Sequence, residues 1–303
     1  MSDAREVRRA AVVMVILVIV WGYSWVLSKV GLRFCGPLDF ATLRTALGAL
    51  TLLPALLWMR KPLRPQHPRY ALTIGLIQTA GFLLLNNYAL SLGEAGKTAI
   101  LVFTMPFWVL ILGWPVLGER IDIGGWIAVG LAAIGLVFLL EPWAMRAAWL
   151  ANILAVLAGV CWALGVVFAK KLHNREPVDS FNFTFWQMLF GVIPMTIIAT
   201  ATHSRPIQWT PEFIAIFILL GVFATAGGWM MWLYVLHRMP AGTASMGSLA
   251  IPVIALVSSA IQLGERPHAS ELTGMAFIVV ALAIVSWVAI SKHLETEPLM
   301  GQE

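Results

Sequence analysis

The chain alternates between long apolar segments and short polar connections. Ten apolar segments can be read, and each ends at charged residues or at a cluster of glycine and proline. A helix needs about 20 residues to cross roughly 30 Å of hydrocarbon. The pattern therefore predicts ten membrane-spanning helices, over residues 10–30, 39–59, 70–91, 95–117, 122–140, 148–171, 178–202, 212–236, 241–263 and 269–291.

The short connections leave no room for a soluble catalytic or nucleotide-binding domain. The sequence also contains no glycine-rich phosphate-binding loop, which excludes an ATP-driven pump encoded in this chain. The first apolar segment is too long for the h-region of a cleaved signal peptide, and no A-x-A-like site follows it. We therefore expect this segment to remain in the protein as its first span.

One stretch of sequence occurs twice. Residues 88–120 match residues 234–266 after a shift of 146 positions without a gap, and 10 of the 33 positions are identical. The matched positions include one proline (Pro106 and Pro252) and a Gly-Glu-Arg turn that ends at Arg120 and Arg266. A weaker match reaches the start of each half, where Trp21 and Lys29 correspond to Trp162 and Lys170. The chain therefore resembles a duplicated unit.

The duplication has a topological consequence. Each unit holds five predicted spans, an odd number, so the second copy must enter the membrane in the opposite orientation. We expect an all-α membrane protein of ten transmembrane helices in two inverted five-helix repeats. These are residues 1–144 and residues 145–303, the latter including a cytoplasmic tail. Inverted repeats build alternating-access transporters that bind substrate near the midplane, between the halves.

The composition supports a multi-pass membrane protein and argues against a disulfide framework or a metal site. Hydrophobic residues make up 60% of the chain and charged residues 12%, and the mean hydropathy is +0.85. Soluble domains carry about 25% charged residues. The only cysteines, Cys35 and Cys161, are too few for a disulfide framework or a metal cluster. We expect neither a metal nor a cofactor.

The net charge of +5 indicates topology rather than nucleic-acid binding. Outside the predicted spans there is no basic stripe with interleaved aromatic residues, which a nucleic-acid partner would require. With the N-terminus inside, the inner loops hold 13 Lys and Arg residues and the outer loops hold 6. Because cytoplasmic loops carry the excess of Lys and Arg, both termini are predicted to lie in the cytoplasm.

Several of these features together resemble a known family. They are the ten-helix inverted repeat, the Trp21-Gly22 pair in the first span, Arg44 early in the second, and the Gly-Glu-Arg turns that close the fourth and ninth spans. The chain resembles the drug/metabolite transporter superfamily, EamA type, over essentially its whole length. Within that superfamily it is most similar to the YddG-type amino-acid exporters. The resemblance implies a bacterial inner-membrane protein that exports amino acids, aromatic ones included.

Polar side chains in the third span are the first candidates for substrate binding. Gln78, Phe82 and Asn86 recur at every fourth residue and so share one helix face. Asn86 corresponds to Trp232 under the 146-residue shift, and Trp232 shares a face with Trp229 in the eighth span. Polar groups at mid-depth either line a substrate pathway or join helices by hydrogen bonds. The sequence leaves both alternatives open for the two amides.

Deeply placed tryptophans and one arginine complete the candidate set. Trp21, Trp108 and Trp162 lie too far from the predicted span ends for an interfacial belt, and they suit flat side chains or, by cation–π contact, an ammonium. Arg44 lies about five residues from the outer end of its span. It either binds a substrate carboxylate or extends its head group to the membrane surface.

The predicted function is export of amino acids by alternating access around a tryptophan-rich cavity. Exporters of other small metabolites or of cationic drugs are the alternatives, and an integral-membrane lipid-modifying enzyme is a rival from another class. We do not expect an enzyme, because neither half shows a cluster of His or acidic residues at one membrane interface beyond the Gly-Glu-Arg turns. The expected partners are a small-molecule substrate and membrane lipid, and a monomer suffices. The turns at Glu119 and Glu265 are interpreted as structural.

Overall fold

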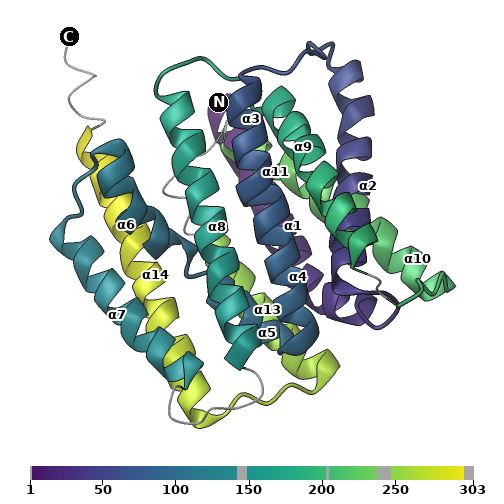
Figure 1. The fold of residues 1–303 in the computed structure, drawn as a ribbon. Helices are drawn as coiled ribbons and strands as arrows, with labels where there is room; N and C mark the ends of the chain where they lie inside the picture. The colour runs from purple at the N-terminus through teal and green to yellow at the C-terminus, as the bar shows by residue number, and fades with distance from the viewer. Residues whose placement is uncertain (1, 142–148, 203–204, 237, 239–246, 297–303) are drawn as a thin grey trace.

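In the computed structural model, every regular element of the described residues is helical (Figure 1). The described residues are 2–141, 149–202, 205–236, 238 and 247–296. Two elements, η1 and η2, are π-helical segments that continue directly from one α-helix into the next. The elements are α1 (Ser2–Gly31), α2 (Pro37–Trp58), α3 (Pro68–Ile74), η1 (Gly75–Gly81), α4 (Phe82–Leu92), α5 (Ala95–Val102), α6 (Met105–Leu117), α7 (Ile123–Leu140), α8 (Trp149–His173), α9 (Ser180–Ala201), α10 (Pro211–Ile218), η2 (Leu219–Gly227), α11 (Gly228–Leu236), α13 (Ala250–Leu263) and α14 (Ala269–Thr296).

Eight helical stretches of the described residues are long and apolar enough to cross a membrane. Each falls on one of the ten predicted spans. The predicted span 70–91 is present as the continuous run α3–η1–α4, but its side chains include Gln78, Asn86 and Asn87, which lower its hydropathy. The predicted span 241–263 is described only from residue 247 onward, where α13 provides a shorter apolar helix. The protein is therefore an all-helical, multi-pass membrane protein.

Local structure recurs at the same 146-residue offset as the sequence. The segment η1 (75–81) corresponds to residues 221–227, which lie within η2. The turns after α6 and α13 both place a glycine in the left-handed region, with φ of 73° at Gly118 and 69° at Gly264. The helical run α5–α6 is interrupted at Phe103 and Thr104, and the matching Leu249 interrupts the helix before α13. Both interruptions come shortly before the matched prolines.

The helices pack closely where glycines face one another. A Cβ atom on Gly135 of α7 would lie 2.8 Å from the carbonyl oxygen of Gly274 on α14, and the reverse contact would measure 2.7 Å. A Cβ on Gly75 would lie 2.6 Å from the carbonyl oxygen of Gln187 on α9. Small residues allow such close approach of helices in membranes. The α7–α14 pair stands at one edge of the bundle, and α2 and α10 stand at the other (Figure 1). Between these edges lie α1, α4, α8 and α9, with α4 packed against α8 and α9 packed against α2.

Candidate functional site

A cavity of about 130 Å³ lies among the middle helices. Its walls come from α1, α2, η1, α4, α8, α9, η2 and α11, with Phe103 and Ile251 completing them. Gln78 and Trp162, two of its lining residues, lie near the middle of their helical runs, Pro68–Leu92 and Trp149–His173. Seven of the nine predicted site residues line this central cavity: Trp21, Arg44, Gln78, Phe82, Asn86, Trp162 and Trp229.

Aromatic side chains form two groups at the central cavity. Trp21 meets Trp229 edge to face, with ring centroids 6.3 Å apart. Its indole Nε1 donates a hydrogen bond to the carbonyl oxygen of Ala224 at 2.9 Å, which ties α1 to η2. The second group is Phe82 and Trp162, whose centroids are 4.7 Å apart. The cavity therefore has flat apolar walls on helices from both halves of the sequence.

Two predicted tryptophans do not line the cavity. Trp232 lies behind Trp21, with ring centroids 6.1 Å apart, and so supports the wall without facing the cavity. Trp108 donates its indole N–H to the hydroxyl oxygen of Thr104 at 3.2 Å, within its own half of the chain. Helical periodicity places a residue on a face, but the neighbouring helix decides whether that face meets a cavity or another side chain.

Arg44 is held inside the bundle by two hydroxyl groups. Its Nε donates to Oγ1 of Thr225 at 3.1 Å, and its Nη1 donates to Oγ of Ser28 at 3.0 Å. Thr225 and Ser28 donate their own hydroxyl protons to the carbonyl oxygens of Leu220 and Ser24, so their lone pairs face the guanidinium. The structure thus directs Arg44 toward the cavity and not toward the membrane surface. Its hydrogen-bond partners in the described part of the chain include no carboxylate.

The two predicted amides have different environments. Gln78 accepts a hydrogen bond from Nε2 of Gln187 at 3.0 Å, so it joins η1 to α9 as well as lining the cavity. Asn86 is only 6% exposed, and its Oδ1 has no hydrogen-bond partner among the described residues. An unpaired buried acceptor is costly, because it loses its bonds to water without replacement. Asn86 therefore offers an acceptor to whatever enters the cavity.

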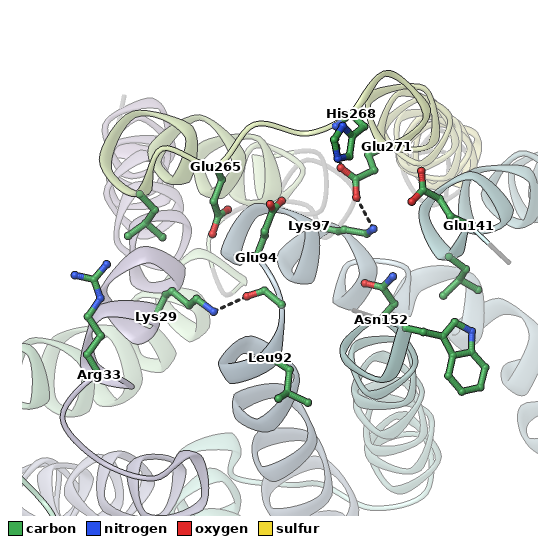
Figure 2. Close-up of a pocket in the computed structure, with 14 residues that line it drawn as sticks. Lys29, Arg33, Leu92, Glu94, Lys97, Glu141, Asn152, Glu265, His268 and Glu271 are labelled. Atoms are coloured by element: carbon green, nitrogen blue, oxygen red, sulfur yellow. Dashed lines mark hydrogen bonds and ion pairs between the residues drawn. The ribbon is translucent and has the colours of Figure 1, made fainter. Parts of the chain in front are cut away.

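A second, larger cavity of about 490 Å³ lies at the end of α1 away from the N-terminus. Figure 2 shows the charged side chains that converge on it from several elements. We call this cavity the vestibule, and its charged or titratable lining residues are Lys29, Arg33, Glu94, Lys97, Glu141, Glu265, His268 and Glu271. Trp21, Ser24 and Ser28 of α1 line the central cavity. Lys29 of the same helix and Arg33 of the turn that follows it line the vestibule.

Sequence reasoning did not find the vestibule or the residues that orient Arg44. The vestibule residues stand singly at helix ends and in loops, and only the packing of α1, α5 and α14 brings them together. Burial raises the pKa of the Glu94 carboxyl, and the nearby carboxylates of Glu265 and Glu271 raise it further. Ser28 looks like any small residue on a packing face. Only its hydrogen bond with Arg44 shows that it helps to orient that side chain.

Comparison with known proteins identifies one family over most of the chain. The model of the EamA-like transporter family matches residues 8–141 and again residues 149–287. The chain is 32% identical over 284 residues to the uncharacterized transporter YvbV of Bacillus subtilis (strain 168), covering 92% of each protein. It is 30% identical over 290 residues to a probable amino-acid metabolite efflux pump of Escherichia coli (strain K12), covering 91% of this chain and 94% of that protein. A solved crystal structure shares the fold, with a TM-score of 0.63 at 16% identity, over 95% of this chain and 99% of that one.

Proposed function

The chain belongs to the EamA-like transporter family, and from this premise we propose that it exports amino acids across a bacterial inner membrane. Two inverted five-helix units, residues 1–144 and 145–303, alternate access to the central cavity, with both termini in the cytoplasm. The export step moves the substrate and makes or breaks no covalent bond. One observation supports this proposal most directly. In a single aromatic cavity, the guanidinium of Arg44 is held by neutral hydroxyl groups, and the buried amide of Asn86 has an oxygen without a hydrogen-bond partner among the described residues.

The inverted arrangement has support from sequence and local structure. The 146-residue offset relates the π-helical segments η1 and η2, and also the left-handed glycines Gly118 and Gly264. The family model matches the chain twice, once in each proposed unit. With α3–η1–α4 and the predicted span 241–263 added to the eight apolar stretches, each unit holds five spans. An odd number of spans per unit gives the second unit the opposite orientation.

Arg44 is the proposed carboxylate site. A guanidinium has five N–H donors, and the two hydroxyl oxygens of Ser28 and Thr225 leave it with donors to spare. A buried cation without a counter-ion is costly, and an anionic ligand removes that cost. Arginine also binds a carboxylate through two parallel hydrogen bonds. An α-amino acid supplies this carboxylate.

Asn86 and the aromatic walls are proposed to bind the remainder of the substrate. The free Oδ1 of Asn86 accepts a hydrogen bond from the ammonium group, and Gln78 lies one helical turn from Phe82 on the same wall. Trp21, Phe82, Trp162 and Trp229 contact the side chain of the substrate, which favours apolar and aromatic amino acids. Trp232 supports Trp21 from behind, and we place Trp108 outside the binding set.

The lining of the central cavity argues against a cationic drug as the substrate. The described lining contains one arginine and no Asp or Glu, so a cationic drug would meet an unbalanced positive charge. A carboxylate is expected where a membrane protein binds a cation. Export of another small carboxylic metabolite fits the same geometry apart from the Asn86 contact. This second candidate would be recognised by transport that does not require an amino group.

An efflux experiment on the purified full-length protein tests this function. Liposomes containing the protein are loaded with labelled leucine or phenylalanine, or with phenethylamine, which lacks the carboxylate, and release is followed with and without a pH gradient. Release from protein-free liposomes is subtracted, because a neutral amine also crosses the bilayer unaided. We expect protein-dependent efflux of the two amino acids and none of the amine. Absence of protein-dependent efflux for every amino acid tested would refute export, and faster protein-dependent release of the amine than of phenylalanine would refute the carboxylate site.

A further inference from the structure

One polar contact at the central cavity occurs twice in the chain. Arg44 of α2 donates a hydrogen bond to the hydroxyl oxygen of Thr225 in η2. Gln187 of α9 meets Thr79 of η1 in the same way, with Nε2 donating to Oγ1 at 3.4 Å. Thr79 and Thr225 are related by the 146-residue shift. Arg44 and Gln187 therefore bind matched threonines, and both line the central cavity.

The glycines beside the two contacts support this match. Gly48 lies four residues after Arg44, and a Cβ on it would lie 2.5 Å from the side chain of the threonine that Arg44 binds. Gly191 lies four residues after Gln187, and a Cβ on it would lie 2.5 Å from the side chain of the threonine that Gln187 binds. The 146-residue shift does not pair Arg44 with Gln187. Their equivalence on α2 and α9 is therefore visible only in the packing.

The two equivalent positions differ in charge. Arg44 is the one charged residue in the described lining of the central cavity, and Gln187 is a neutral amide. A guanidinium favours a carboxylate, whereas an amide forms hydrogen bonds with neutral polar groups. The position of Gln187 therefore suits a neutral polar group of the same substrate whose carboxylate is drawn to Arg44.

Gln187 and Gln78 form a hydrogen-bonded pair of amides. Nε2 of Gln187 donates to Oε1 of Gln78 at 3.0 Å and to the hydroxyl oxygen of Thr79, so both of its N–H groups are used. Oε1 of Gln187 and Nε2 of Gln78 make no hydrogen bond in the described part of the chain. An amide oxygen accepts and an amide nitrogen donates. The pair thus keeps one acceptor and one donor group for a ligand.

Close helix packing fixes the amide pair in place. A Cβ on Gly165 of α8 would collide with the side chain of Gln78, and a Cβ on Gly75 would lie 2.6 Å from the carbonyl oxygen of Gln187. Gln78 is 9% exposed and Gln187 is 7% exposed. A site that fixes polar groups for a substrate hydroxyl rejects the analogue that lacks it, because those groups are then left unpaired.

The pair lies at one end of an aromatic wall. Gln78 and Asn86 are eight residues apart on the run η1–α4, which is roughly 12 Å along the helix axis, and Phe82 lies between them. A substrate with its ammonium at Asn86 therefore places an aromatic ring along Phe82. The far end of that ring points to the amide pair.

We propose that Gln187, together with Gln78, is a specificity-determining site for a neutral hydroxyl group at the end of the substrate side chain. A phenol hydroxyl donates its proton to Oε1 of Gln187, and its oxygen accepts from Nε2 of Gln78. Because the walls of the central cavity select a flat ring, the preferred substrates are hydroxylated aromatic amino acids, of which tyrosine is the simplest. This inference rests on the proposed export function and names its substrate class.

A comparison of substrates in the unaltered protein tests the inference. Liposomes containing the full-length protein are loaded with labelled tyrosine and phenylalanine at equal, sub-saturating concentrations, and release from protein-free liposomes is subtracted. We expect tyrosine to leave about ten-fold faster, the effect of one to two neutral hydrogen bonds. The analogue 4-fluorophenylalanine carries a substituent at the same ring position without a hydroxyl proton, and it should leave at the rate of phenylalanine.

Gln187→Met tests the residue itself. Methionine keeps a long, unbranched side chain and removes the amide, so the ratio of tyrosine to phenylalanine efflux should fall to about one. A loss of folded protein lowers both rates and leaves this ratio unchanged. Gln78→Met should lower the ratio in the same direction by a smaller factor, because the acceptor of Gln187 remains.

Gln66→Met is the matched control. Oε1 of Gln66 accepts a hydrogen bond from the backbone N–H of Asp179 at 2.9 Å, so Gln66 also joins the two halves of the chain, but it does not line the central cavity. Its substitution should leave the ratio at the wild-type value.

The outcomes separate this inference from the proposed function. Equal efflux of tyrosine and phenylalanine by the wild type would overturn the hydroxyl site and leave export intact. A tyrosine preference that survives Gln187→Met, or that falls equally in Gln66→Met, would also overturn the assignment. Absence of protein-dependent efflux for every amino acid would instead refute the export function, and the inference with it.

Discussion

The ammonium of Lys97 lies 2.5 Å from a carboxylate oxygen of Glu271, and both side chains are only 8% exposed. Breaking a buried ion pair leaves one charge without compensation, which typically costs about 3–5 kcal/mol. We expect Lys97→Met to lower the free energy of unfolding by about 3 kcal/mol. Thermal unfolding of the purified protein in detergent measures this loss.

The double variant Lys97→Met with Glu271→Leu is the control for that prediction. Replacing both partners of a buried pair by apolar residues is often neutral or stabilising. The double variant should therefore recover most of the stability that Lys97→Met loses. A double variant less stable than either single variant would show that the two residues act separately.

Arg44→Lys tests the proposed carboxylate site. Lysine keeps the positive charge but lacks the planar group that binds a carboxylate through two parallel hydrogen bonds. It also cannot reproduce both contacts, to Thr225 and to Ser28, in the same geometry. We expect the initial rate of phenylalanine efflux to fall about ten-fold or more, the cost of one well-placed charged contact. Efflux at the wild-type rate would place the carboxylate elsewhere.

Asn86→Leu should separate stability from transport. The Oδ1 of Asn86 has no hydrogen-bond partner in the part of the chain that the structure describes, so an apolar residue of similar size removes a desolvation cost of about 1 kcal/mol. We expect a higher unfolding temperature together with strongly reduced amino-acid efflux.

The neighbouring Asn87 provides the matched control for Asn86. Its Oδ1 also has no hydrogen-bond partner among the described residues and its side chain is fully buried, but it does not line the central cavity. Asn87→Leu should therefore change stability in the same sense while efflux continues. Equal loss of efflux in both variants would indicate a packing effect and not a binding contact.

Glu94 should make stability depend on pH in a defined direction. Burial, followed by the proximity of Glu265 and Glu271, raises the pKa of Glu94 above its ordinary value of 4.5. A raised pKa means that the folded protein favours the protonated carboxyl. The contribution of this protonated form to the stability of the fold is complete below the ordinary pKa and is lost as pH rises through the raised value. Glu94→Gln should thus gain stability over the wild type from about pH 4.5 upward.

The measurement for Glu94 is a series of unfolding temperatures between acidic and mildly alkaline pH. The difference between the variant and the wild type should grow with pH and then level off. A difference that shrinks with rising pH would mean that the ionised form of Glu94 is stabilised by a contact in the folded protein.

Trp21→Phe should test the bond between α1 and η2. Phenylalanine keeps an aromatic ring but loses the hydrogen bond from Nε1 to the carbonyl oxygen of Ala224, worth about 1 kcal/mol. We expect a modest fall in the unfolding temperature and a larger fall in efflux of aromatic amino acids. Trp126→Phe is the control, since Trp126 is an exposed residue of α7.

The sequence by itself determined which parts of the chain are helical spans. Each main-chain polar group in a bilayer needs a partner within its own segment, so a run of about 20 apolar residues has to be a helix. Helical periodicity also placed Gln78, Phe82 and Asn86 on one face. Matched turns at Gly118 and Gly264 followed from a conformation that glycine adopts readily.

Only the tertiary structure decided what those faces meet. Arg44 and Thr225 are 181 residues apart, and Gln78 and Gln187 are 109 apart, yet each pair shares a hydrogen bond. Neither local periodicity nor composition encodes such partners, because they depend on how whole helices pack across the bundle. For the same reason Trp108 and Trp232 had the right depth without reaching the cavity, while the vestibule came from charges that look isolated along the chain.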